Sequence, residues 1–181
     1  MAKKETISRD VIMQAAFSIL QEEGIGQVTA RKLAARANCS TQPIFRAYRN
    51  MEEVSEELFG KACEFFQEYY RSFPGKTATP FVNLGQAYIR FAGEHKKVFA
   101  FLFLSPERFG RSMYDIVNGR DGCVSREIQK AHSRGCRDTG TLFTKIWIFI
   151  HGAACMCFTG DYDLSEDETL QALQAAYDSF R

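Results

Sequence analysis

Apolar residues recur at intervals of three and four along most of the chain, and this spacing predicts helices. In the first segment they form one stripe opposite polar positions: Ile7, Val11, Ile12, Ala15, Ala16, Ile19 and Leu20. Ser8 or Thr6 can cap the start of this helix, and Gly24 stands where a left-handed residue can end it. We therefore expect a first helix that ends before Gly24.

Two shorter helices are predicted before residue 50. Thr29 can cap the first of them, and a short break is expected at Asn38 and Cys39. Ser40 can cap the second, with Pro43 in its first turn, where the missing N–H costs little. Three short helices, two of them joined by a tight turn, predict a helix-turn-helix.

The rest of the chain is also predicted to be helical, and no alternating strand pattern is present. The expected helices cover residues 51–70, 80–93, 96–104, 107–135 with an interruption at 118–122, 142–158, and a last one after residue 165. Ser165 and Glu168 form a capping box that opens this last helix. We predict an all-α fold with a helix-turn-helix domain over residues 1–50 and a helical ligand-binding and dimerisation domain over 51–181.

Charge is distributed unevenly between these two domains. The first fifty residues hold eight Lys and Arg against four acids, whereas the remaining 131 hold fifteen against eighteen. A basic head on a mildly acidic body suits a module that binds a polyanion, although a chance imbalance gives the same numbers.

Several other classes of protein are not supported by the residues. The six cysteines include no C-x-x-C pair and no zinc-finger spacing with the three histidines, so we expect reduced thiols and no metal. The N-terminus lacks a signal-peptide pattern, and the longest apolar stretch, 146–158, is shorter than the ~20 residues of a membrane span. No catalytic motif is present. We expect a soluble cytoplasmic protein that is neither an enzyme nor bound to a cofactor or membrane.

The segment from Val28 to Tyr48, with Ala15-Ala16 and Gly24 before it and Asn50 to Glu53 after it, resembles the TetR family of bacterial transcriptional regulators. The resemblance is specific over residues 7–58 and looser beyond them. It implies a dimeric regulator that binds a palindromic operator in double-stranded DNA. Met51 stands where the family has a Lys that contacts phosphate, and Arg49 can substitute for it.

The residues of this segment also suit DNA recognition by their own chemistry. Gln42 can read adenine, and Arg46 can read guanine or hold a phosphate. Thr29 and Arg31 offer a hydroxyl, a backbone amide and a charge to one phosphate. The full set of predicted DNA contacts is Thr29, Arg31, Ser40, Thr41, Gln42, Pro43, Phe45, Arg46, Tyr48 and Arg49. The alternatives are a solvated charged face, or a scaffold whose basic head meets an acidic protein.

The resemblance further implies that residues 51–181 hold an effector pocket and that the last two long helices form a homodimer interface. The helix predicted over 142–158 is apolar on all sides and therefore needs cover on more than one face. The expected ligand is an unidentified small molecule, and the candidate pocket residues are Tyr88, Phe91, Phe99, Phe103, Tyr114, Trp147 and His151. Each of them can instead be core. A repressor released by its effector is the expected function; an activator, or a regulator without a ligand, would use the same residues.

Overall fold

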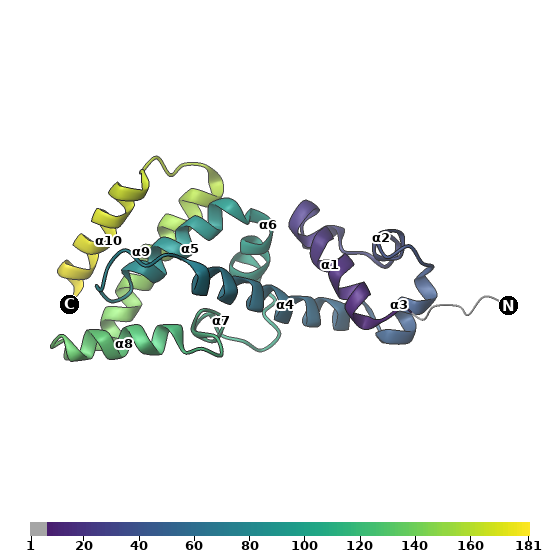
Figure 1. The fold of residues 1–181 in the computed structure, drawn as a ribbon, viewed down its shortest axis with the longest axis horizontal. Helices are drawn as coiled ribbons and strands as arrows, with labels where there is room; N and C mark the ends of the chain where they lie inside the picture. Colours follow the sequence, from purple (N-terminus) through teal and green to yellow (C-terminus); the bar gives the residue numbers. More distant parts are fainter. Residues whose placement is uncertain (1–6) are drawn as a thin grey trace. The chain divides into compact units, whose positions relative to one another are not determined.

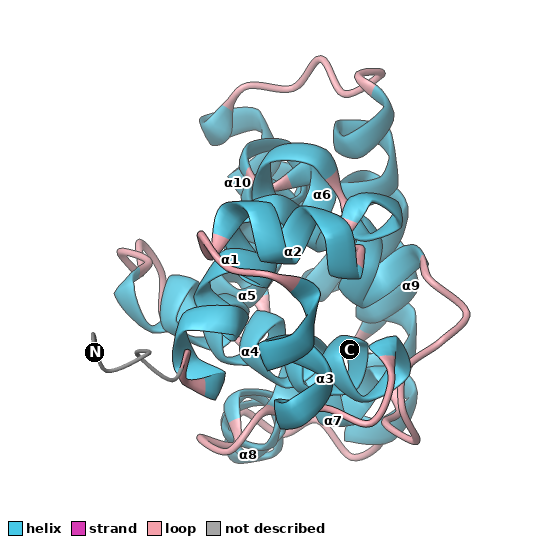
Figure 2. Ribbon diagram, turned by 90° about the vertical axis from the view of Figure 1, so that its right-hand side faces the viewer, coloured by secondary structure: helices cyan, strands magenta, loops and turns pink. Residues whose placement is uncertain are grey.

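A computed structural model describes residues 7–181, and these form helices joined by loops, with no strand among them (Figure 2). Two compact units are present. Unit 1 comprises the described residues up to Glu64 together with Lys97–Gly110, and unit 2 comprises Phe65–Lys96 and Arg111–Arg181. The all-α prediction is confirmed. The alternative cap Thr6 lies outside the described residues, as do Lys3 and Lys4, two of the eight basic residues counted in the first fifty.

The first helix of unit 1, α1 (Arg9–Glu23), has the predicted ends. The Ser8 hydroxyl accepts a hydrogen bond from the Val11 N–H at 3.3 Å, and Gly24 ends the helix with φ of +91°. Apolar residues of the predicted stripe, such as Ile12, Ala16 and Leu20, are fully buried. Val11 is the exception: although it was assigned to the stripe, it is 40% exposed, because it lies at the edge of the buried face.

Two short helices pack on α1 after the single turn η1 (Ile25–Gln27): α2 (Ala30–Arg36) and α3 (Thr41–Ala47). The turn between α2 and α3 contains Asn38 with φ of +51°, a left-handed conformation that Asn tolerates better than most residues. In this turn the Cys39 N–H donates to the Ala34 carbonyl at 2.9 Å. The predicted helix-turn-helix is therefore present, with its break at the predicted residues.

The long helix α4 (Met51–Ser72) starts in unit 1 and ends in unit 2. In unit 1 its buried Phe59 meets the ring of Phe101 edge-on at 5.3 Å and that of Phe109 at 5.5 Å. Phe101 belongs to a π-helical turn, η2 (Ala100–Leu104), that continues the short helix α6 (Lys96–Phe99). The single helix predicted over 96–104 is thus divided into two conformations.

Unit 2 is built around α5 (Val82–Glu94), α9 (Thr139–Thr159) and α10 (Glu166–Phe180), which pack on one another (Figure 1). Gly85 allows their close approach, because a Cβ there would lie 2.8 Å from Leu173 and 3.0 Å from Ile150. The predicted capping box of Ser165 and Glu168 opens α10.

The stretch predicted as one interrupted helix contains α7 (Met113–Asn118) and α8 (Cys123–Ser133), separated at Gly119 and Gly122, whose φ angles are positive. The interruption is as predicted, but residues 107–112, which were predicted to be helical, are not. On α8 the buried Glu127 carboxylate accepts the Phe81 N–H at 2.6 Å and pairs with Lys130. This bond holds Phe81, with φ of +64°, immediately before α5 begins.

α9 is longer than the sequence indicated. Asp138 caps it by accepting the Thr141 N–H at 2.9 Å, so the helix starts three residues before the predicted first residue, 142. Its 21 residues are long and apolar enough to cross a membrane, which corrects the estimate made from the 146–158 stretch. Core helices of soluble proteins pass the same test of length and composition. Only 22% of its most apolar stretch is buried within the chain.

Candidate nucleic-acid interface

The outward face of α3 carries most of the residues predicted to contact DNA. Ile44 is completely buried and fixes the rotation of the helix. Residues two positions before and two positions after Ile44 lie about 200° around the helix from it, so Gln42 and Arg46 point outward. Thr41, Gln42 and Arg46 are exposed, and the Phe45 ring is 50% exposed. Pro43 is half-buried in the first turn.

Two hydroxyl residues mark the starts of the short helices. The Thr29 hydroxyl oxygen accepts the Lys32 N–H at 3.3 Å and caps α2, and its hydrogen remains available for donation. Ser40 occupies the N-cap position of α3 without a side-chain capping bond. Both residues are exposed, so each can offer a hydroxyl to an incoming group.

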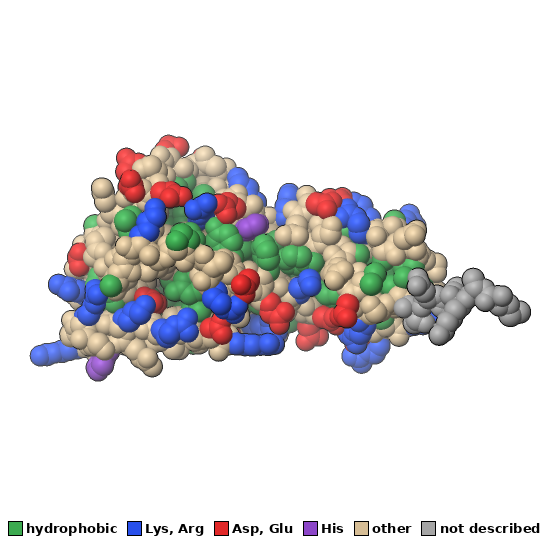
Figure 3. Space-filling view, viewed as in Figure 1, with side chains coloured by type: hydrophobic (Ala, Val, Ile, Leu, Met, Phe, Trp, Pro, Cys, Tyr) green, Lys and Arg blue, Asp and Glu red, His purple; other side chains and the backbone are tan. Residues whose placement is uncertain are grey.

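Ion pairs divide the basic residues of unit 1 into two groups. Arg36 forms two hydrogen bonds to the Glu22 carboxylate, at 2.9 and 2.8 Å, and these bonds hold the pKa of Glu22 below its usual value. Lys32 is paired with Glu23 and also donates to Gln27 at 2.7 Å. On the drawn face of this unit, Lys and Arg side chains accordingly lie beside Asp and Glu side chains (Figure 3). Lys32 and Arg36 therefore connect α2 to α1 and η1.

Arg31 and Arg46 belong to the other group. Within residues 7–181 neither forms an ion pair, and both side chains are exposed. Arg49 is intermediate: its side chain is 90% exposed, and its Nε lies 3.4 Å from the Glu53 carboxylate. Among the cations of residues 29–50, those that remain available to an external anion are therefore at the start of α2, on α3 and just before α4.

Tyr48 differs from the other predicted contacts because it is buried. Its side chain is 2% exposed, and burial raises the pKa of its hydroxyl. The Arg9 guanidinium covers the ring, 4.3 Å from its centroid, and also pairs with Glu57 at 2.7 Å. The Tyr48 ring is part of the core of unit 1 in this structure, so its contact with DNA remains a prediction from sequence alone.

The start of α4 is held by local hydrogen bonds. Asn50 accepts the Glu53 N–H at 2.9 Å, and the Glu53 carboxylate accepts the Arg49 N–H at 2.8 Å, which lowers the pKa of Glu53. Met51 is half-buried. This corner therefore presents Arg49 as its exposed cation.

The aromatic residues predicted to line a ligand pocket are distributed over both units. In unit 2, Tyr88 and Phe91 are fully buried, and the Tyr88 hydroxyl is 3.0 Å from His151 Nδ1. Trp147 stacks on His151 at 5.9 Å and meets Tyr88 edge-on. Tyr88, Trp147 and His151 are therefore in contact with one another.

Three further members of the predicted set lie elsewhere. Phe99 and Phe103 are buried in unit 1, with ring centroids 5.2 Å apart. Tyr114 is 38% exposed on α7, and its hydroxyl is 3.0 Å from that of Ser125. The seven residues are therefore divided between the two units, and their role as ligand contacts remains a prediction.

The structure has a cavity at a place that the sequence did not indicate. It has a volume of about 300 Å³, lies wholly in unit 2, and is lined by residues that include Lys76, Gln86, Arg90 and Glu166. Ion pairs connect Glu166 to Arg90 and to Lys76 at this site. These partners are 76 and 90 positions apart in the chain, so no local sequence pattern predicts them.

The cysteines are all free, and within the described residues no group of three His, Cys, Asp or Glu is arranged to hold a metal ion. Burial raises the pKa of Cys123, Cys155 and Cys157. Raised thiol pKa values reduce the thiolate fraction near neutral pH, so these three are poorly reactive.

Residues 12–58 match the model of the family described as bacterial regulatory proteins, tetR family. None of the curated proteins matches the chain.

Solved structures extend the similarity to nearly the whole chain. A TetR-family protein from Vibrio parahaemolyticus is 18% identical, with a TM-score of 0.66 over 94% of this chain and 96% of that one. A TetR-like transcriptional regulator from Rhodococcus sp. RHA1 is 15% identical, with a TM-score of 0.63 over 93% and 92%. A family member from Streptomyces coelicolor A3 is 16% identical, with a TM-score of 0.63 over 93% and 96%. At these identities the likeness shows the fold.

Proposed function

We propose, from the membership of this chain in the TetR family of transcriptional regulators, that it is a homodimeric repressor that binds a palindromic operator and is released by a small-molecule effector. As a member of a family of transcription regulators, it is a DNA-binding protein rather than an enzyme. We assign operator binding to residues 1–50, and dimerisation and effector binding to residues 51–181. Its place of action is the cytoplasm.

The observation that carries the DNA-binding proposal is the outward face of α3. A recognition helix must present donors and acceptors to base edges while its other side packs on the domain. Gln42 and Arg46 are exposed on that face, and Ile44 is buried behind them. Phe45 lacks a hydroxyl, so its exposed ring suits an apolar contact such as a thymine methyl.

The unpaired cations support phosphate contacts at the edges of this face. Arg31 and Arg46 do not have to give up a carboxylate partner to bind an anion, whereas Lys32 and Arg36 do. Thr29 and Ser40 add exposed hydroxyls at the starts of α2 and α3. Together they form a set of positioning contacts around the base-reading side chains.

The dimer is assigned to α9 and α10. α9 exposes a stripe of residues spaced three or four apart, in which Ile148 is 68% and Met156 49% exposed. Gly152 lies on the same stripe, and a Cβ there would meet nothing within 4 Å. Such a surface suits close packing of a second helix. A two-fold dimer would place two recognition helices ~34 Å apart, one turn of DNA.

Selection of random duplex DNA by the purified full chain tests this function. We expect enrichment of a two-fold symmetric sequence at near-physiological salt, since two α3 helices related by dimer symmetry read the two half-sites alike. Enrichment of an asymmetric sequence would contradict the dimer, and enrichment of none would contradict operator binding. The selected operator then allows effectors to be scored by the loss of DNA binding.

A further inference from the structure

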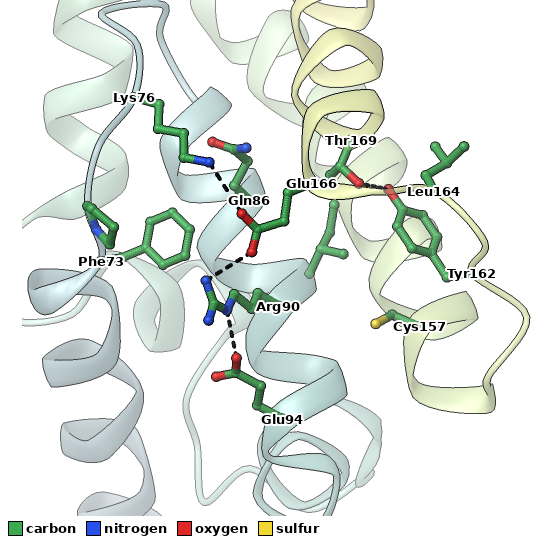
Figure 4. Close-up of a pocket in the computed structure, with 12 residues that line it drawn as sticks. Phe73, Lys76, Gln86, Arg90, Glu94, Cys157, Tyr162, Leu164, Glu166 and Thr169 are labelled. Carbon is green, nitrogen blue, oxygen red and sulfur yellow. Dashed lines mark hydrogen bonds and ion pairs between the residues drawn. The ribbon is translucent and has the colours of Figure 1, made fainter.

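The cavity of about 300 Å³ in unit 2 is enclosed by three parts of the chain (Figure 4). One wall is the segment after α4, with Phe73 and Lys76, and a second is the α5 face that carries Gln86 and Arg90. The third comprises the end of α9, the following loop and the start of α10, with Glu166. Ile89 and Leu164 add apolar surface.

Gln86 is a buried polar residue whose hydrogen bonding is incomplete. Its side chain lines the cavity and is only 6% exposed, and its Oε1 atom has no hydrogen-bond partner among the described residues. A buried acceptor without a donor destabilises a protein, and an apolar side chain of the same shape would avoid that cost. The Oε1 atom has almost no exposed surface in this conformation, so a donor that enters the cavity would satisfy it once the Gln86 amide turns toward the cavity.

Two cations share one carboxylate at the rim of the same cavity. Glu166 accepts hydrogen bonds from Lys76 Nζ at 3.3 Å and from an Arg90 guanidinium nitrogen at 3.1 Å. Its side chain is 62% exposed and starts from the first turn of α10. Arg90 also holds Glu94 at 2.6 Å. Of these two carboxylates, Glu166 is the one that can turn to solvent, because Glu94 is further bonded to the Tyr69 hydroxyl at 2.8 Å.

The arrangement favours an anionic ligand over a cationic one. A ligand carboxylate can take the place of Glu166 between Lys76 and Arg90, which keeps both cations paired and leaves Glu166 in water. A ligand ammonium would have to enter between carboxylates that these cations already occupy. A neutral ligand gains nothing from displacing Glu166.

We propose that this cavity binds a small organic acid that carries a hydroxyl or amide donor. Its carboxylate replaces that of Glu166 on Lys76 and Arg90, its donor satisfies Gln86 Oε1, and its hydrocarbon part lies against Phe73, Ile89 and Leu164. Binding breaks the ion pair through which Glu166 of α10 is connected to Arg90 of α5. The link from this release to DNA rests on the proposed function, whereas binding itself does not.

Binding of para-hydroxybenzoate to the full chain, measured by calorimetry and ligand-observed NMR, tests the proposal. Its neutral amide and the cation tyramine are the matched probes of charge, and benzoate is the matched probe of the hydroxyl. We expect the acid to bind at least about tenfold more tightly than the amide and tyramine. Equal binding of the acid, its amide and tyramine would overturn the assignment. So would the absence of binding of the acid at a concentration of about 10 mM.

Three variants locate the bound acid. Glu166→Gln removes the competing carboxylate and should tighten binding by up to about tenfold, as expected when only a minor fraction of the site is open. Arg90→Gln should weaken it by about tenfold or more. Gln86→Leu should raise the melting temperature of the free protein and abolish the preference for para-hydroxybenzoate over benzoate. Arg126→Gln, which alters an exposed arginine outside the cavity, should leave binding unchanged.

The outcome of these experiments separates the site from the regulation. Weaker binding by Glu166→Gln, or an unchanged hydroxyl preference in Gln86→Leu, contradicts the site. If the acid binds as described but does not weaken binding to the selected operator, the site stands and its role in releasing DNA is wrong.

Discussion

The outward faces of α3 and α9 are both exposed, but they carry opposite chemistry. α3 is a seven-residue helix that turns Gln42 and Arg46 to solvent, whereas the 21-residue α9 exposes Ile148 and Met156. A short polar face suits the base edges of a groove, and a long apolar face suits burial against another helix. The difference teaches that exposure alone does not identify a partner; the chemistry of the exposed side chains does.

The largest expected effect comes from placing a charge on the α9 face. Ile148→Glu should convert the dimer to a monomer, because a carboxylate buried at an apolar interface has no partner there. Loss of the second half-site should weaken operator binding by about 100-fold or more. Light scattering and DNA titration measure the two effects.

Gln129→Glu is the matched control, since it adds the same charge at an exposed position of α8. It should leave both mass and affinity unchanged. If Ile148→Glu remains dimeric, α9 is not part of the dimer interface.

A smaller effect is expected when the α3 face loses a base-reading side chain. Gln42→Ala should cost about 1–3 kcal/mol of operator binding and relax the preference at one base pair in each half-site. Repeating the DNA selection with the variant measures both. If the selected sequence stays the same, Gln42 does not lie in the groove.

Two arginines of α2 provide a matched pair for the phosphate contacts. Arg31→Ala should weaken binding to all sequences alike, by a few-fold, and flatten the dependence of affinity on salt, because it removes a cation without a protein partner. Arg36→Ala removes a cation that Glu22 already holds, so it should slightly lower the melting temperature and leave the salt slope unchanged. Equal salt slopes for the two variants would show that ion pairing does not separate their roles.

The smallest effect is on the pH dependence of stability. It concerns unit 2 but neither the α3 face nor the α9 face. His95 meets the rings of Phe65, Tyr69 and Phe91 at 4.9 to 5.4 Å, and burial lowers its pKa, with Glu94 acting in the opposite direction. The unfolded chain therefore takes up this proton first as the pH falls. The stability that neutral His95 contributes is complete above its unfolded pKa of ~6.5 and is lost as the pH falls toward the folded value.

His95→Phe should reduce the fall of the melting temperature between about pH 7 and about pH 5. Operator binding at about pH 7 should be unchanged. Thermal unfolding at a series of pH values measures this. An identical decline in the variant would mean that another group titrates.

The residues predicted to contact DNA and those predicted to contact a ligand differ in where the structure places them. The predicted contacts on α2 and α3 are exposed around the buried Ile44, with the exception of Tyr48, which Arg9 covers. Arg9 and Tyr48 are 39 positions apart in the sequence, so no local pattern marks this contact. The predicted ligand aromatics divide between two units, because an aromatic side chain at helical spacing looks the same in a core and in a pocket.

The sequence by itself determined the all-helical fold, the caps at Ser8, Thr29 and Ser165, and the turn at Asn38. These features depend on residues within about four positions of each other, so local spacing is enough to specify them. Only the tertiary structure decided that Arg36 is paired while Arg31 is not, and that Glu166 joins Lys76 to Arg90 beside the buried Gln86. Those partners come from distant parts of the chain, and they meet only when the helices pack.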